Sequence, residues 1–147
     1  MRLTAFTDYS LRVLMYLATA PEGRGTIAGI AAAFGISENH LVKVVHLLGR
    51  EGLLLNTRGR GGGLALARPA REINVGAVVR LTEGGDVPAE CFLESGNCAI
   101  TKVCRLAGVF EQALAGFYRV LDGYTVADLV ENRRAVAAIL HSRPRAA

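Results

Sequence analysis

Residues 26 to 50 hold two helical patterns separated by a glycine, and this arrangement constrains the fold more than any other part of the chain. The first helix runs from about Thr26 to Phe34, and Gly35 can supply the left-handed residue of a tight turn. Ser37 then caps a longer helix. The apolar residues of that helix recur on one side and are Leu41, Val44, Val45 and Leu48. The pattern is typical of a helix-turn-helix unit.

The other side of the second helix is polar and basic. At about 100° per residue it carries Asn39, Lys43, His46 and Arg50, with His40 on its flank. Charged residues most often lie on solvated surfaces, so this face alone would not indicate a ligand. In a helix-turn-helix unit, however, the second helix is the one that can enter the major groove of DNA.

Two short strand patterns follow, over residues 53–57 and 64–66, and they are joined by Arg58-Gly59-Arg60-Gly61-Gly62-Gly63. The spacing predicts a β-hairpin wing with Arg58 and Arg60 at its tip, where the glycines allow close approach to another molecule. The glycines do not form a nucleotide-binding loop, because the final Gly of G-x-G-x-x-G is missing and no Lys-Ser or Lys-Thr follows.

The positive charge of the chain is concentrated in this region. The net charge of +4 comes from 17 basic and 13 acidic residues, but residues 40–71 hold six basic side chains and a single acid, Glu51. A local excess beside a helix-turn-helix pattern and an arginine-bearing hairpin favours binding to double-stranded DNA over a merely solvated surface. The residues expected to face DNA are Ser37, Asn39, His40, Lys43, Arg50, Arg58 and Arg60.

These DNA-facing residues are expected to contact different parts of the DNA. Lys43 and Arg50 would mostly meet phosphates, and the two hairpin arginines would reach the backbone or the minor groove. Asn39 and His40 could read base edges.

Two further helices complete the N-terminal part of the chain. Apolar residues recur at helical spacing over residues 6–17, with Thr7 available as an N-cap, and a fourth helix is expected over residues 75–83. The sequence therefore predicts a mainly α fold with a small β-hairpin, in which residues 1–83 form a winged helix-turn-helix DNA-binding domain.

The C-terminal part is also expected to be helical. Residues 106–121 describe a long helix whose broad apolar face needs a cover, and we expect a dimerisation helix, although it could instead pack on its own domain. A last helix begins at Thr125, where Asp128 stands in the position of a capping-box acid, and His141 falls in a loose tail. The predicted units are thus a cysteine loop over residues 84–104 and a dimerisation helix with a C-terminal helix over residues 105–147.

All three cysteines of the chain, Cys91, Cys98 and Cys104, lie within fourteen residues on one loop. An odd, clustered set indicates metal binding or redox chemistry rather than a disulfide framework. The gaps of six and five residues do not match the C-x2-C to C-x4-C knuckles of zinc sites. Longer spacings suit a loop wrapped around an iron-sulfur cluster, for which three cysteines are one ligand short.

Few residues could supply the missing ligand. His40 and His46 are placed on the DNA-facing helix, and Asp8 stands in the first turn of the first helix. A carboxylate there favours the helix dipole and can pair with Arg12 at i,i+4. From the residues alone Asp8 is therefore structural, and the fourth ligand could come from the chain, a partner subunit or solvent.

Several motifs together resemble one known family. The motifs are Met1-Arg2-Leu3-Thr4-x-Phe6-Thr7-Asp8-Tyr9-x-Leu11-Arg12, Ser37-x-Asn39-His40-Leu41-Val42-Lys43, Arg58-Gly59-x-x-Gly62-Gly63, the three-cysteine loop and Tyr124-Thr125-Val126-Ala127-Asp128-Leu129-Val130. With these motifs the chain resembles the NsrR-type nitric-oxide-sensing repressors within the superfamily of iron-sulfur winged-helix regulators. The one departure is the first cysteine gap, which in relatives tends to be a residue shorter.

The resemblance implies a homodimer that binds a palindromic operator and represses genes for nitric oxide detoxification. It implies that Cys91, Cys98 and Cys104 hold an iron-sulfur cluster, 4Fe-4S in preference to 2Fe-2S, with Asp8 of the partner subunit as the fourth ligand. Nitric oxide would be the signal, and its attack would displace the carboxylate first, because oxygen is a harder and more readily displaced ligand than thiolate.

Other functions are kept as alternatives. The nearest is a redox- or iron-sulfur-status-responsive regulator of cluster biogenesis with the same fold. A cluster-carrying interaction protein that never meets DNA is another. From a different class, a cysteine-based thiol oxidoreductase lacks support because the chain has no C-x-x-C pair, so we expect no enzyme.

The sequence also bears on location. Its apolar stretches are shorter than the roughly 18 residues of a membrane span, and Asp8 interrupts the region where a signal peptide would be apolar. We therefore expect a cytoplasmic protein with no membrane segment.

Overall fold

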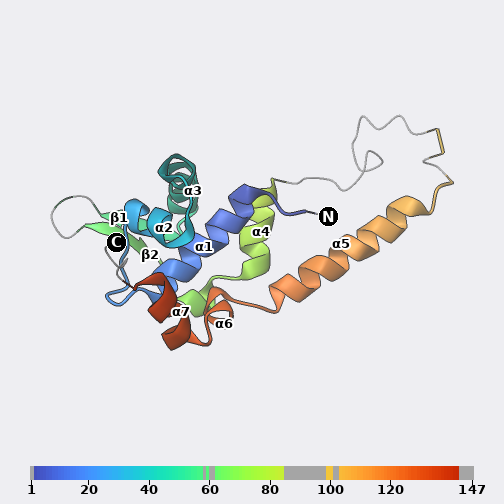
Figure 1. Ribbon diagram of the computed structural model, residues 1–147. Helices are drawn as coiled ribbons and strands as arrows, with labels where there is room; N and C mark the ends of the chain where they lie inside the picture. Colours follow the sequence, from blue (N-terminus) through green and yellow to red (C-terminus); the bar gives the residue numbers. More distant parts are fainter. Residues whose placement is uncertain (1, 58, 60–61, 85–98, 101–102, 143–147) are drawn as a thin grey trace.

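The structure is a computed structural model that describes residues 2–57, 59, 62–84, 99–100 and 103–142 (Figure 1). It is mainly helical and contains a small two-stranded sheet within the described residues, as the sequence predicted. The elements in chain order are α1 (Ala5–Thr19), α2 (Ile27–Phe34), α3 (Glu38–Arg50), β1 (Leu54–Thr57), β2 (Gly63–Leu66), the 3-10 turn η1 (Ala70–Glu72), α4 (Val75–Glu83), α5 (Leu106–Asp122), α6 (Val126–Leu129) and α7 (Arg133–Leu140).

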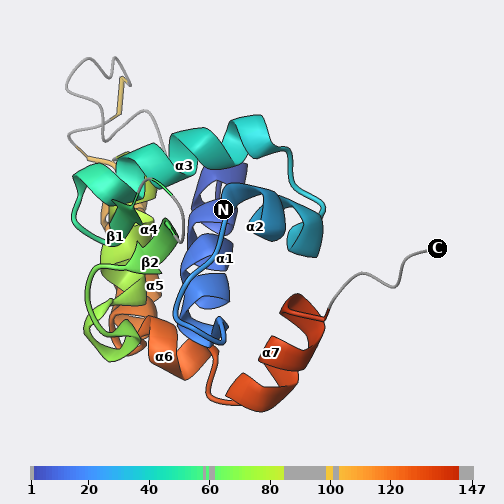
Figure 2. The ribbon, with the colours of Figure 1, turned by 90° about the vertical axis from the view of Figure 1, so that its left-hand side faces the viewer.

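Helix α1 lies at the centre of the N-terminal part, with α2, α3, α4, the hairpin and α7 arranged around it (Figure 2). Its N-cap is Thr4, whose hydroxyl accepts a hydrogen bond from the backbone N–H of Thr7 at 3.3 Å. The prediction that Thr7 would cap this helix was therefore wrong. Thr4 has the extended backbone that a cap needs, whereas Thr7 lies inside the helix and is fully buried.

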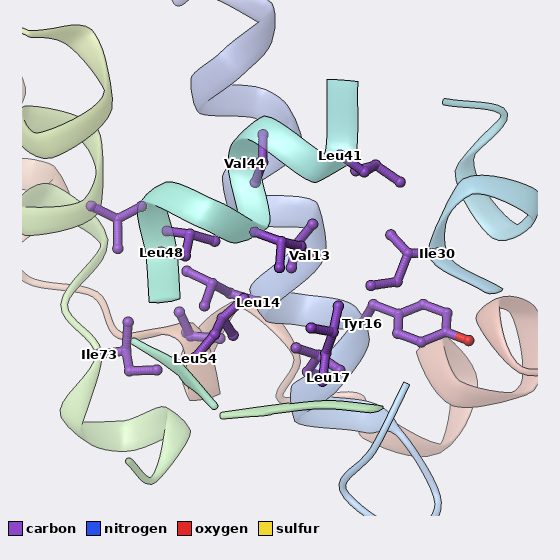
Figure 3. Packing of buried hydrophobic residues seen from close by; sticks show 14 of the residues in the cluster. Val13, Leu14, Tyr16, Leu17, Ile30, Leu41, Val44, Leu48, Leu54 and Ile73 are labelled. Atoms are coloured by element: carbon purple, nitrogen blue, oxygen red, sulfur yellow. The ribbon is translucent and has the colours of Figure 1, made fainter. Parts of the chain in front are cut away.

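The hydrophobic core lies where α1 meets α2, α3 and the hairpin (Figure 3). Val13, Leu14 and Leu17 of α1 are at most 2% exposed. Each such side chain contributes about 1.5–3 kcal/mol when it leaves water. The predicted apolar stripe of α3 is confirmed as part of this core. Its partners from the other elements include Ile30, Leu54, Leu64 and Ile73.

The turn between α2 and α3 matches the helix-turn-helix prediction. Gly35 adopts a left-handed backbone with φ of 65°, and the N–H of Ile36 closes the turn on the carbonyl of Ala31 at 3.1 Å. Ser37 stands at the N-cap position of α3, as predicted, but its hydroxyl makes no capping hydrogen bond.

The predicted hairpin is present, with β1 and β2 antiparallel and Leu54 opposite Leu66. Its base is tied to the chain after α1 by a bridge in which Gly25 and Leu64 exchange backbone hydrogen bonds of 2.9 and 2.8 Å. A Cβ at Gly25 would lie 2.7 Å from the ring of Tyr16, and a Cβ at Gly63 would lie 2.8 Å from the Gly25 carbonyl oxygen. Both positions therefore require glycine.

Helix α5 extends away from the rest of the protein and meets it at its C-terminal end, where it packs on α4 (Figure 1). None of its residues is buried within the chain. In the described part of the chain, no helix is both long and apolar enough to cross a membrane.

The last helical segment is divided, which the sequence did not predict. Thr125 and Asp128 form the expected capping box, but α6 ends at Leu129 and α7 begins after Asn132. Helix α7 packs on α1, and His141 is not in a loose tail. Its Nε2 lies 3.1 Å from the Thr19 hydroxyl, and its ring meets that of Tyr16 at 4.4 Å.

Candidate nucleic-acid interface and metal ligands

The outward side of α3 is the strongest candidate for a binding surface. The residues predicted to face DNA from this helix are all exposed, while the apolar stripe beneath them is buried. The exposed set is Ser37, Asn39, His40, Lys43 and Arg50. The structure therefore places five of the seven predicted DNA-facing residues on one continuous helical surface.

Two other side chains on this face were not assigned from the sequence. Glu38 opens the helix and Val42 lies on the second turn, and both are exposed. An acid at the first position favours the helix dipole. The exposure of Val42 could have been inferred from the sequence, because this residue falls outside the apolar stripe of α3.

The hairpin stands beside the C-terminal end of α3 (Figure 2). A guanidinium nitrogen of Arg68 donates to the carbonyl of Gly52 at 3.1 Å, which joins the end of the hairpin to the turn that precedes it. Arg58 and Arg60, predicted for the hairpin tip, lie outside the described residues.

The contacts of Asp8 confirm the ion pair that the sequence predicted. Its carboxylate pairs with Arg12 one turn later at 3.0 and 2.9 Å, as the i,i+4 spacing predicted. The Asp8 side chain is 47% exposed, so a second molecule can reach it. The guanidinium of Arg12 also lies 5.5 Å from the ring centre of Phe34, the last residue of α2.

Tyr9, the neighbour of Asp8, touches the recognition surface directly. Its ring stacks on that of His40 with the centroids 6.1 Å apart and an angle of 30° between the planes. The N-terminal half of α1 therefore contacts both helices of the helix-turn-helix unit, through Arg12 on Phe34 and through Tyr9 on His40.

Cys104 is the one predicted thiol ligand that the structure describes. It is half-buried and lies just before α5, where the backbone N–H of Leu106 donates to its sulfur at 3.4 Å. Such N–H donation to sulfur is common around iron-sulfur ligands. Cys91 and Cys98 lie outside the described residues. Among the described residues, no three His, Cys, Asp or Glu side chains converge on a common point.

Glu83 links the start of the cysteine loop to the first turn of α1. Its carboxylate accepts hydrogen bonds from the Thr4 backbone at 2.9 Å, from the Thr4 hydroxyl at 3.1 Å and from the Thr7 hydroxyl. Burial raises the pKa of the Glu83 carboxyl, but the hydrogen bonds from Thr7 and Thr4 outweigh it and lower the pKa below its ordinary value. The neighbouring Thr82 bonds Thr7 at 2.8 Å. Sequence reasoning missed this network, because its partners are 79 residues apart.

A second polar contact fixes the angle of α5. Arg80 of α4 forms a bidentate pair with Asp122 at 2.6 and 2.7 Å and lies over the ring of Tyr118 at 4.3 Å. The hydrogen bonds of the pair lower the pKa of Asp122 and raise that of Arg80. Gly76 leaves the space that the Asp122 carboxylate fills.

These features together define a DNA-binding regulator built on a winged helix-turn-helix domain that is followed by a long exposed helix. The chain belongs to the Rrf2 family, which is described as an iron-dependent transcriptional regulator and which it matches over residues 3–132.

Individual relatives carry a more specific name. The chain is 49% identical to the HTH-type transcriptional regulator NsrR of Geobacillus kaustophilus over 145 residues, which cover 97% of this chain and 99% of that protein. It is 45% identical to the protein of the same name from Bacillus subtilis over 142 residues, which cover 95% and 97%. The resemblance to NsrR-type regulators is therefore confirmed. Because these relatives are transcriptional regulators, the chain is a regulator and not a thiol oxidoreductase.

Solved structures support the fold. The chain is similar to T. potens IscR with a TM-score of 0.73 and 27% identity, over 90% of this chain and 88% of that one. It is also similar to the oxidized form of Staphylococcus aureus CymR with a TM-score of 0.72 and 26% identity, over 89% and 97%. The predicted winged-helix fold is confirmed.

Proposed function

We propose that this protein is a homodimeric repressor that binds a palindromic operator and releases it when nitric oxide attacks an iron-sulfur cluster. The genes it controls would be those for nitric oxide detoxification. The observation that carries the DNA-binding part is the exposed polar and basic face of α3 over a fully buried apolar stripe. The name NsrR of the relatives supports the signal. A regulator that binds operator DNA works in the cytoplasm.

The dimer is supported by the surface of α5. Three of its large apolar side chains are more than half exposed, with Leu106 at 51%, Val109 at 56% and Val120 at 61%. A helix of 17 residues that buries none of them within its own chain needs a partner to cover it. We assign residues 105–147 to dimerisation and C-terminal packing, and residues 84–104 to the cluster-binding loop.

The ligand set proposed for the cluster is Cys91, Cys98 and Cys104 of one subunit with Asp8 of the partner subunit. Three thiols and one carboxylate suit iron, and the described members agree with that role, because Asp8 is accessible and the Cys104 sulfur accepts a backbone N–H. When bound, the cluster would supply an iron that a small diatomic gas can attack. We favour 4Fe-4S over 2Fe-2S.

The contacts of α1 supply a route from Asp8 to the DNA surface. Binding of the Asp8 carboxylate to the cluster would act on the part of α1 that also carries Tyr9, whose ring stacks on that of His40. It also competes with Arg12, which lies over Phe34 at the end of α2. Release of Asp8 would therefore shift the population of helix-turn-helix orientations toward one with poor operator affinity.

The experiment is an anaerobic absorption and native mass spectrum of the purified protein during stepwise addition of nitric oxide, with operator binding followed in parallel. We expect a dimer with one cluster per subunit, whose loss parallels loss of DNA binding. A colourless protein, or one that carries zinc, would contradict the ligand set.

Two variants separate ligation by Asp8 from its ion pair. Asp8→Ala removes the carboxylate and the pair, whereas Arg12→Ala removes the pair and keeps the carboxylate. We expect only Asp8→Ala to change the reaction of the cluster with nitric oxide. Equal behaviour of the two variants would show that the ion pair, not ligation, is what matters.

A regulator that responds to iron or redox status is the second candidate, because the family is described as iron-dependent. The same protein preparation separates the two. Loss of operator binding on oxidation or iron chelation, with no response to nitric oxide, would favour this alternative.

A further inference from the structure

The exposed surface of α3 contains one large apolar side chain. Val42 is 52% exposed, while the other large aliphatic residues of this helix are buried or half-buried. On the helical surface Val42 follows Asn39 by three residues and precedes His46 by four, with Lys43 beside it. An isopropyl group thus stands among side chains that hydrogen bond or carry charge.

The fold does not explain a valine at this position. β-Branched residues are poorer helix formers than alanine, leucine or lysine, because the helix restricts χ1. An exposed helix position gives no packing in return. Replacing Val42 with alanine should therefore leave the stability of the domain unchanged or raise it slightly.

A binding role does explain it. The edges of the base pairs in the major groove present hydrogen-bond donors and acceptors and a single kind of apolar group, the C5 methyl of thymine. We infer that Val42 contacts a thymine methyl in each half of the operator, an inference that rests on the proposed binding of DNA through α3.

The position of Val42 in α3 supports this contact. Val42 belongs to the first two turns of α3, and it is the N-terminal residues of a recognition helix that reach base edges. Its side chain is stiff, so little rotamer entropy is lost on binding. Asn39, on the same face, has the amide that pairs with adenine. The two together favour an A·T-rich core in each half-site.

The test uses a duplex selected from a randomised double-stranded library by the wild-type holo-protein. Each thymine of that duplex is then replaced singly by deoxyuridine, which removes only the methyl group. Because one buried methyl is worth about 0.8 kcal/mol, we expect about a fourfold loss of wild-type affinity at one thymine per half-site and no loss at the others.

The variant Val42→Ala completes a double-mutant cycle with the deoxyuridine replacement. We expect it to bind the unmodified duplex about three- to tenfold more weakly than wild type and to be indifferent to deoxyuridine at that one thymine. Val42→Thr keeps the shape and the β-branching and exchanges one methyl for a hydroxyl, so it should lose part of the sensitivity. Circular dichroism melts would verify that all variants fold.

Ile139→Ala is the matched control, since Ile139 is an exposed aliphatic residue on α7, away from α3 (Figure 2). It should keep the wild-type affinity and the wild-type deoxyuridine profile. A wild-type protein that binds its duplex with a flat deoxyuridine profile would overturn the inference, as would a Val42→Ala variant that keeps the same sensitive thymine. Selection of no duplex at all would instead overturn the proposed function, and the Val42 contact with it.

Discussion

Asp122, at the end of α5, reaches back to α4 and holds Arg80 by two hydrogen bonds of 2.6 and 2.7 Å. The same carboxylate occupies the space beside Gly76 in which a side chain would otherwise lie. The angle between the winged domain and its long helix therefore depends on a residue that has no side chain.

Substitution of Gly76 should disturb this contact. In Gly76→Ala the new Cβ collides with the Asp122 carboxylate and lies 3.1 Å from the Asp122 backbone nitrogen, so the ion pair must shift. We expect a loss of about 1–3 kcal/mol in the free energy of unfolding, measured by urea denaturation. Gly49→Ala is the control, because a Cβ there meets nothing within 4 Å, and it should stabilise α3 by about 0.5–1 kcal/mol. Equal effects of the two variants would contradict the role of the space beside Gly76.

Acid should weaken the link between Glu83 and α1. Because the pKa of Glu83 is lowered in the folded state, its contribution is fully present above its ordinary value of 4.5 and is lost as the pH falls through the lowered folded value. Glu83→Gln keeps the accepting oxygen and removes the titration. Thermal melts between pH 6 and about pH 3 should show a shallower decline for this variant than for wild type. Glu22→Gln, which removes a carboxylate from an exposed turn, should decline as wild type does.

His141 should make the packing of α7 sensitive to mild acid. Burial lowers its pKa, against a smaller opposite effect of its bond to the Tyr16 backbone, so the folded state favours the neutral ring. The contribution of the His141 contacts to stability is then complete above pH 6.5, the ordinary pKa of histidine. It falls as the pH drops from there toward the lower pKa of His141 in the folded state.

His141→Phe retains an aromatic ring against Tyr16 and carries no proton. Its melting temperature should change less than that of wild type between pH 7.5 and about pH 5.5. His46→Gln changes a histidine exposed on α3 and should melt as wild type does at both pH values. A wild-type protein whose melting temperature is constant across this range would contradict the prediction.

A charge on the apolar side of α5 should abolish the dimer. In Val109→Asp an exposed aliphatic side chain of the proposed seam becomes a carboxylate that would have to lose its water. Analytical ultracentrifugation should find a monomer, with operator affinity reduced at least tenfold, because only one half-site is then held. Gln112→Glu adds a negative charge to the same helix without removing an apolar side chain and should stay dimeric. A dimeric Val109→Asp would exclude this face of α5 as the seam.

The sequence predicted the helix-turn-helix unit, the hairpin and the long helix that follows the cysteine loop, because each depends on local spacing and turn residues. Gly35 with the stripe from Leu41 to Leu48 was enough to orient α3 and to expose its basic face. The pairing of Asp8 with Arg12 was also predictable, since both lie on one helix.

Contacts between distant parts of the chain were not predictable in this way. The hydrogen bonds of Glu83 to Thr4 and Thr7 join residues whose nearness depends on the packing of α4 on α1. The docking of His141 on Thr19 spans 122 residues and depends on a helix break that apolar periodicity does not reveal.

The base and the tip of the wing differ in how freely they can change. At the base neither Gly25 nor Gly63 can carry a side chain, because a Cβ at Gly25 would collide with the Tyr16 ring and one at Gly63 would collide with the Gly25 carbonyl oxygen. The hairpin therefore leaves the domain in one fixed direction, while its length beyond the base is set only by how many residues the tip contains. Evolution, or an engineer, can extend or shorten the reach of the wing without altering where it is aimed.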